Sequence, residues 1–178
     1  MILLAAYVIV TAWVVHSSRS QPPPPIAVTG VIVQPPFEAG KPLRISIEMV
    51  SEVSGLKIRG WNYTAVGVAD DNALSEARRP ANEEKLWQAY KEKARRAGPL
   101  ELTAIKGTMN TPLLGPVLTA GDVEALGSAN GIVYSLGQVD YGSGALDYCV
   151  YFRPSIGGRG TLCVEHNGPS VNRAEFRR

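Results

Sequence analysis

The clearest pattern in the chain is a strict alternation of apolar and polar residues in LRISIEM, which opens the segment 43–53. A period of two predicts an antiparallel strand with one face buried. Shorter alternations and apolar runs between Gly and Pro residues predict six further strands, at 26–37, 56–66, 99–109, 131–141, 145–154 and 160–167. Residues 110–116, NTPLLGP, are predicted to break the fourth of the seven strands.

Residues 82–98 predict a helix that begins at Asn82 as the N-cap, with Glu83 and Glu84 in its first turn. We interpret the charged side chains of this helix as a solvated surface. Its apolar stripe is formed by Leu86, Trp87, Tyr90, Ala94 and Ala97.

A second, short helix is predicted over 118–128, with Thr119 as its N-cap. Residues 67–80 are predicted to form a loop that contains Asp70 and Asp71. These two carboxylates lack the regular ligand spacing of a calcium loop, so a solvated turn is favoured over a cation site.

Seven strands with two short helical insertions predict a mainly β fold, an antiparallel immunoglobulin-like sandwich. The 178 residues contain 18 Gly and 13 Pro, as many turns require, and 45% are hydrophobic. The net charge of +2 comes from basic residues scattered among acidic ones. This pattern predicts no basic face and therefore no nucleic acid partner.

The N-terminal run MILLAAYVIVTAWVV predicts a single transmembrane anchor over 1–18. A cleaved signal peptide and a buried helix of the folded domain are the alternatives. Residues 19–25 contain four consecutive prolines and predict a stiff polyproline II linker. The β-sandwich domain is expected over 26–168, followed by a flexible tail over 169–178.

The two cysteines, Cys149 and Cys163, fall on the last two predicted strands. In a hairpin centred on Ile156–Gly157, Cys149 faces Cys163 and Tyr151 faces Thr161. Directly opposed residues lie close to the distance that a disulfide needs. We therefore predict a Cys149–Cys163 disulfide, and with it a compartment outside the reducing cytoplasm.

Three other uses of the cysteines fit less well. A redox dithiol favours C-x-x-C near the start of a helix, and a zinc site needs more ligands than His166 and the distant His16 supply. In a strand, Cys163 and His166 would point to opposite faces, which disfavours a nucleophile pair. The sequence predicts neither a metal nor a cofactor.

Known catalytic motifs do not occur in the sequence, from glycine-rich phosphate loops to G-x-S-x-G and H-E-x-x-H. Asp140, Asp147 and Glu165 lie on neighbouring predicted strands, where their carboxylates could approach one another. Acid–base chemistry would further require a cleft that separates their pKa values. We predict that the chain is not an enzyme, with a hydrolase as the weakest alternative.

Large side chains near predicted loops are the candidates for contact with a partner. These are Trp87, Tyr141 and Arg153, an aromatic or guanidinium group in each case. Trp61 is expected in the core. Asn62 opens an N-glycosylation sequon, Asn-Tyr-Thr, which matters only in a eukaryotic secretory pathway.

Three stretches are similar to parts of uncharacterised bacterial membrane-anchored proteins with a periplasmic immunoglobulin-like β-sandwich domain. They are PPFEAGKPLRISIEMVSEVSG, LTAGDVEALGSANGIVYSLGQVDYGSGALDYCVYF and TLCVEHN, within residues 26–167. The resemblance implies a single-pass inner-membrane protein with its C-terminal domain in the periplasm, and no catalytic residues. Such proteins carry a longer membrane region, so the chain is expected to lack part of its beginning.

These observations predict a membrane-tethered periplasmic binding or interaction module. The alternative from a different class is an accessory subunit of an envelope complex, whose anchor would pack against the helices of a partner protein. Glycines at the four-residue spacing typical of such packing do not occur in the anchor.

Overall fold

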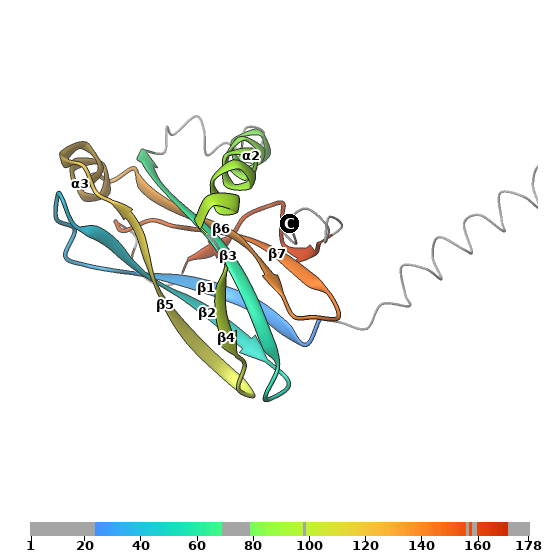
Figure 1. The fold of residues 1–178 in the computed structure, drawn as a ribbon. Coiled ribbons are helices and arrows are strands. Elements are labelled where there is room, and N and C mark those ends of the chain that lie inside the picture. Colours follow the sequence, from blue (N-terminus) through green and yellow to red (C-terminus); the bar gives the residue numbers. More distant parts are fainter. Residues whose placement is uncertain (1–23, 69–78, 98, 156, 158–159, 171–178) are drawn as a thin grey trace, which may run out of the picture.

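The computed structural model describes residues 24–68, 79–97, 99–155, 157 and 160–170. These residues form two antiparallel sheets and two short helices (Figure 1). The mainly β, sandwich-like architecture is therefore confirmed. No helix among these residues is long and apolar enough to span a membrane. The predicted anchor, 1–18, lies outside the described residues.

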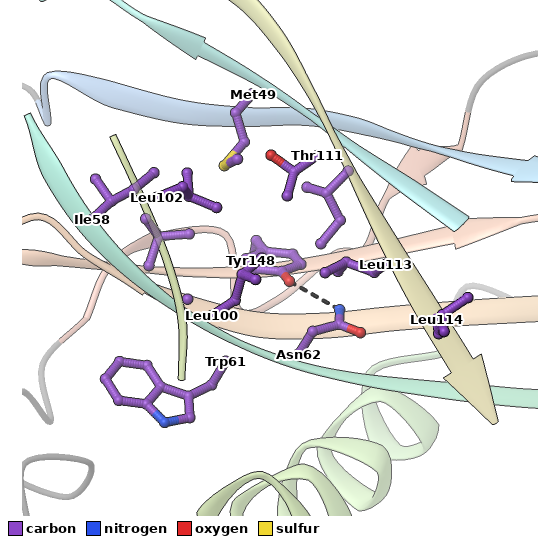
Figure 2. Close-up of a pocket in the computed structure, with 13 residues that line it drawn as sticks. Met49, Ile58, Trp61, Asn62, Leu100, Leu102, Thr111, Leu113, Leu114 and Tyr148 are labelled. Atoms are coloured by element: carbon purple, nitrogen blue, oxygen red, sulfur yellow. Dashed lines mark hydrogen bonds between the residues drawn. The ribbon is translucent and has the colours of Figure 1, made fainter. Parts of the chain in front are cut away.

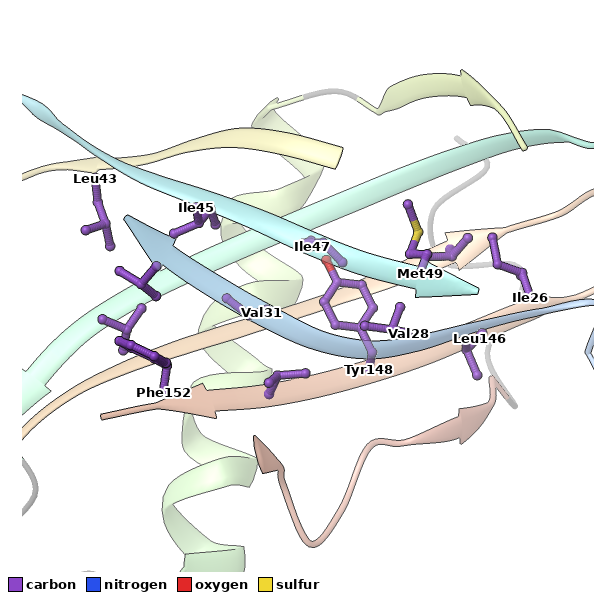
Figure 3. Close-up of a cluster of buried hydrophobic side chains, with 14 of the residues drawn as sticks. Ile26, Val28, Val31, Leu43, Ile45, Ile47, Met49, Leu146, Tyr148 and Phe152 are labelled. Atoms are coloured by element: carbon purple, nitrogen blue, oxygen red, sulfur yellow. The ribbon is translucent and has the colours of Figure 1, made fainter. Parts of the chain in front are cut away.

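The first sheet has three strands in the order β1-β2-β5. They are β1 (Ile26–Gln34), β2 (Pro42–Ser51) and β5 (Gly107–Val117). The central strand β2 carries the alternation seen in the sequence. Its apolar residues Leu43, Ile45, Ile47 and Met49 are buried and face the second sheet (Figure 3).

The second sheet has six strands, in the order β4-β3-β6-β7-β8 with β9 also paired to β7. They are β3 (Lys57–Val68), β4 (Leu100–Thr103), β6 (Gly131–Asp140), β7 (Ala145–Phe152), β8 (Thr161–Leu162) and β9 (Gly168–Pro169). Pairing therefore continues into the first residues of the predicted tail. Residues 171–178 lie outside the described part.

The predicted strand 99–109 and the predicted break at 110–116 are wrong. The chain forms β4 in one sheet, crosses at 104–106, and continues as β5 in the other sheet. Pro112 and Pro116 lie within β5. Proline is tolerated there because β5 is an edge strand, so a proline nitrogen can face away from the hydrogen-bonded neighbour β2.

The first helix, α2 (Arg79–Ala97), begins three residues earlier than predicted, so Asn82 lies inside it and is not its N-cap. Strand β3 reaches Val68, which shortens the predicted loop. Asp70 and Asp71 lie outside the described residues.

The second helix, α3 (Ala120–Gly127), confirms its prediction. Thr119 is the N-cap, and its hydroxyl accepts a hydrogen bond from the Asp122 amide at 3.1 Å. The Asp122 carboxylate accepts one in return from the Thr119 amide at 2.8 Å. Leu126 anchors this helix in the core at one end of the sandwich.

Two hydrophobic clusters stabilise the fold. The larger fills the space between the sheets (Figure 3). The smaller lies on the outer face of the six-stranded sheet, where α2 covers it (Figure 1), and contains Trp61, Trp87, Tyr90, Leu136, Cys149 and Cys163. Trp61 is thus a core residue as predicted, although its cluster lies under the helix and not between the sheets.

The predicted Cys149–Cys163 disulfide is present, with the two Cα atoms 5.3 Å apart. Tyr151 pairs with Thr161, as the predicted hairpin register requires. The bridge joins neighbouring segments of one sheet, whereas the conserved bridge of antibody domains crosses between sheets.

The predicted strand 160–167 is too long, because β8 ends at Leu162 and residues 164–166 form a bend. The argument that Cys163 and His166 point to opposite faces of a strand is therefore wrong. Cys163 belongs to the cluster that contains Trp87, and the His166 ring stacks on Trp87. Cys163 is not a nucleophile in this state because its sulfur is bonded to Cys149.

Candidate functional site

An apolar pocket lies between the two sheets at the side where β4 and β5 form their edges (Figure 2). Its volume is about 180 Å³. The lining side chains are mostly aliphatic and come from both sheets, principally Met49, Ile58, Leu100, Leu102, Thr111, Leu113 and Tyr148. A pocket of this kind recognises shape and apolar surface more than charge.

The pocket exists because β4 is short. It has four residues and pairs only with Lys57–Gly60 of the twelve-residue β3. Beyond Gly60, β3 has no partner on the β4 side among the described residues, and β5 at the edge of the other sheet contributes Thr111, Leu113 and Leu114 to the pocket lining. Gly60 adds to the space, because a Cβ atom there would meet only atoms 4.0 Å away.

A small polar network forms one wall of the pocket. The Asn62 amide donates to the Ser135 hydroxyl at 2.7 Å and to the Tyr148 hydroxyl at 2.9 Å (Figure 2). The Thr64 hydroxyl donates to the Asn62 side-chain oxygen at 3.0 Å. These polar groups satisfy one another, so the pocket offers a ligand an apolar surface whose polar wall is already hydrogen-bonded.

Burial raises the pKa of Tyr148 well above its usual value, so this phenol remains neutral at physiological pH. The ring lies over Gly137, its cross-strand partner. The Asn62 side-chain nitrogen, the atom that would carry a glycan at the sequon noted in the sequence, is hydrogen-bonded within this network.

A second cluster lies at the start of α2, where the turn after β8 packs against the helix. The Glu83 side chain is completely buried, and its carboxylate accepts hydrogen bonds from the amides of Val164 and Glu165, each at 3.1 Å. The prediction that the charges of this helix form a solvated surface is therefore wrong for Glu83. This carboxylate connects the helix to the C-terminal turn.

His166 is the central residue of that turn. Its Nε2 lies 3.0 Å from the Glu84 carboxylate, and its ring stacks on Trp87 with centroids 4.3 Å apart. His166 has a φ of +59°, the left-handed region that few non-glycine residues occupy. Hydrogen bonds from the Gln88 amide and from His166 lower the pKa of Glu84, so this carboxylate stays ionised.

Glu84, Glu165 and His166 together present three possible metal ligands. One donor atom from each residue lies within 4.8 Å of the other two. Glu84 comes from the helix, whereas the other two come from the turn more than 80 residues later. A mixed set of one imidazole and two carboxylates can hold a divalent cation.

The three carboxylates singled out in the sequence have different environments. Asp147 is half-buried and accepts a hydrogen bond from the Gln138 amide at 2.8 Å, and burial raises its pKa above the usual range. Asp140 accepts from the Gly142 amide in the turn after β6. Glu165 belongs to the group with Glu84 and His166, not to a pair with Asp140 or Asp147.

The three predicted contact residues differ in how far their side chains are buried. Trp87 is only 5% exposed, so its expected role as an exposed contact residue is corrected: it packs against Tyr90 and His166. Tyr141 is partly buried against the main core. Arg153 is half-buried, and its Nε and Nη2 atoms have no hydrogen-bond partner in the described structure.

Sequence reasoning missed both the pocket and the histidine–carboxylate group. The cysteines and histidines alone are too few for a zinc site, and the sequence pattern around Glu84 indicates only a solvated position. The pattern EHN after Cys163 indicated polar groups in this region, but not their helical partner. Comparison with known proteins finds no matching family, and no curated protein matches the sequence.

Proposed function

We propose that the chain is a membrane-tethered, extracytoplasmic binding module whose ligand inserts an apolar group into the pocket between the sheets. The observation that carries this proposal is the pocket itself, an apolar opening of about 180 Å³ at the free side of the sandwich. The location is proposed as the inner membrane, with the folded domain in the periplasm.

The disulfide supports the location, because structural disulfides persist in oxidising compartments such as the periplasm. The apolar N-terminal sequence and the proline-rich segment behind it support the tether. The immunoglobulin-like assignment is also part of the proposal. Two facing antiparallel sheets support it, although the disulfide lies within one sheet.

The size and lining of the pocket indicate the chemical class of the ligand. An engineered protein cavity of about 150 Å³ with aliphatic walls binds benzene. A pocket of about 180 Å³ therefore fits an aromatic ring or a short branched aliphatic group. The polar wall is internally satisfied, which favours an uncharged group.

Addition of a partner strand to the edge of β5 is less favourable. The prolines at 112 and 116 cannot donate hydrogen bonds to an added strand, and proline is one of the devices that protect sheet edges. Insertion of a compact apolar group explains the pocket without such pairing.

The proposal can be tested with the full chain in detergent-free nanodiscs, using indole and benzene as probes and methyl NMR of methionine as the readout. The chain has three methionines, and Met49 lines the pocket. We expect saturable shifts of the Met49 methyl signal, because an aromatic ring in the pocket changes its magnetic environment.

Two matched variants on β5 distinguish probe binding in the pocket from probe binding to the protein surface. Thr111→Phe fills the pocket and is expected to weaken probe binding at least tenfold, since the ring occupies the ligand's space. Thr108→Phe makes the same change at an exposed position outside the pocket and should leave binding unchanged. Equal binding by both variants, or an unshifted Met49 signal, would reject the proposal.

A further inference from the structure

We propose that Glu84, Glu165 and His166 form a binding site for one divalent transition-metal ion, with Zn²⁺ as the best fit. This site lies on the outer face of the six-stranded sheet, beside α2, and is independent of the pocket between the sheets. The proposal rests on the geometry of the three donor atoms, the local charge and the support of the turn.

The donor atoms are already close to the arrangement that Zn²⁺ requires. Bonds of about 2.0–2.2 Å in a tetrahedral site place neighbouring donors roughly 3.3–3.6 Å apart. The three donors lie within 4.8 Å of one another, and His166 Nε2 is 3.0 Å from Glu84. Small side-chain rotations would replace this hydrogen bond with two metal bonds and bring Glu165 to the ion.

The local charge favours a cation. Glu83, Glu84 and Glu165 place three carboxylates near the start of α2, where the positive charge of Lys91 also acts on Glu84. No ion pair joins the Glu165 side chain to a lysine or arginine in the described part of the chain. A divalent ion between Glu84 and Glu165 would convert their mutual repulsion into attraction.

The turn that carries two of the ligands is held at several points. The disulfide fixes Cys163 to β7, and the Asn167 side chain bridges the turn by donating to the carbonyls of Cys163 and Glu165. The Glu83 carboxylate holds the amide of Glu165. Such support reduces the ordering cost of metal binding.

The side chains of the ligands themselves are also oriented. Trp87 stacks on the imidazole of His166, and Gln88 donates to the Glu84 oxygen that does not face His166. Hydrogen bonds to the second oxygen of a ligating carboxylate are typical of metal sites.

The donor set selects among metals. An imidazole nitrogen suits Zn²⁺, Cu²⁺ and Ni²⁺, whereas Mg²⁺ and Ca²⁺ prefer sites made entirely of oxygen. Three protein ligands leave a fourth tetrahedral position for water, the arrangement of accessible zinc sites. The disulfide removes both cysteine sulfurs from competition for the ion.

The test uses the full, oxidised, untagged chain after treatment with a chelator. Titration calorimetry with ZnCl₂ is expected to show one saturable site, and a parallel titration with MgCl₂ should show at least tenfold weaker binding. Co²⁺ provides a second readout, because a tetrahedral site gives it strong visible absorption.

Three glutamine variants complete the experiment. Glu165→Gln and His166→Gln each remove one ligand and should weaken Zn²⁺ binding at least tenfold. Glu92→Gln removes an exposed charge from the same helix and should bind like the unchanged chain. Because Glu165 is exposed, its variant is expected to fold even if His166→Gln does not.

Absence of a saturable Zn²⁺ site in the unchanged chain would overturn the proposal. So would a Glu165→Gln variant that binds Zn²⁺ as tightly as Glu92→Gln does. Neither result would affect the proposal for the pocket, which is tested with apolar probes and different variants.

Discussion

At the scale of single residues, Gly137 is a position where the packing leaves no room for a side chain. It pairs with Tyr148 across β6 and β7, and the phenol lies directly over it. A Cβ atom at this position would overlap the Trp61 carbonyl oxygen and the Tyr148 hydroxyl. The absence of a side chain therefore allows Tyr148 to reach Asn62 and form the wall of the pocket.

We expect Gly137→Ala to lower the free energy of unfolding by about 1–3 kcal/mol, because both groups it would meet belong to a packed sheet. Urea denaturation measures this change. Gly67→Ala is the matched control, since a Cβ at Gly67 in β3 meets nothing within 4 Å, and it should be neutral or slightly stabilising. Equal losses in the two variants would contradict the packing described for Tyr148.

At the scale of elements, α3 shows how local signals determine a short helix. The hydrogen bonds between Thr119 and Asp122 close its first turn, and Leu126 attaches it to the core. The backbone and hydroxyl groups of Thr119 lower the pKa of Asp122 below its usual value. The folded state therefore favours the ionised carboxylate.

We expect Asp122→Asn to destabilise the protein at pH 7 by up to about 1 kcal/mol, the size of a typical capping interaction. Because the pKa is lowered on folding, the carboxylate contributes its stabilisation above the pKa of the unfolded chain, about 3.9. That contribution is lost as the pH falls through the lower folded value. Urea denaturation between pH 7 and pH 3 should show the two proteins converging in acid; a constant difference would exclude the charge as the cause.

Other elements could not be predicted from local signals. The prolines of β5 indicated a break, yet an edge strand can accommodate them because only one side must pair. Strand β8 was predicted too long, since the apolar character of TLCV continues into a turn that packs under α2. In both cases the neighbouring element, not the segment's own sequence, determines where the strand ends.

At the scale of the whole molecule, the disulfide links fold and compartment. It joins β7 to the turn that carries His166, so it supports both the sheet and the proposed metal site. The two bonded cysteines are 14 residues apart in the sequence. A loop of this size corresponds to roughly 3 kcal/mol in the chain-entropy account of disulfide stabilisation.

We expect Cys149→Ala combined with Cys163→Ala to lower the free energy of unfolding by roughly 3 kcal/mol, measured by urea denaturation. Reduction of the unchanged chain should produce a loss of similar size. In native membrane extracts, alkylation under denaturing conditions should modify neither cysteine before reduction. Two reactive thiols in such extracts would contradict the proposed periplasmic location.

The amino-acid sequence by itself determined the β class, the buried face of β2, the capped helix α3 and the register of the cysteine hairpin. These features depend on periodicity, capping and turn position, which act between residues close in the chain. Only the tertiary structure decided the exchange between sheets at 104–106, the pocket beside β4, and the meeting of Glu84 with Glu165 and His166. These features depend on contacts between segments far apart in the chain, whose formation requires the sheets and α2 to pack together.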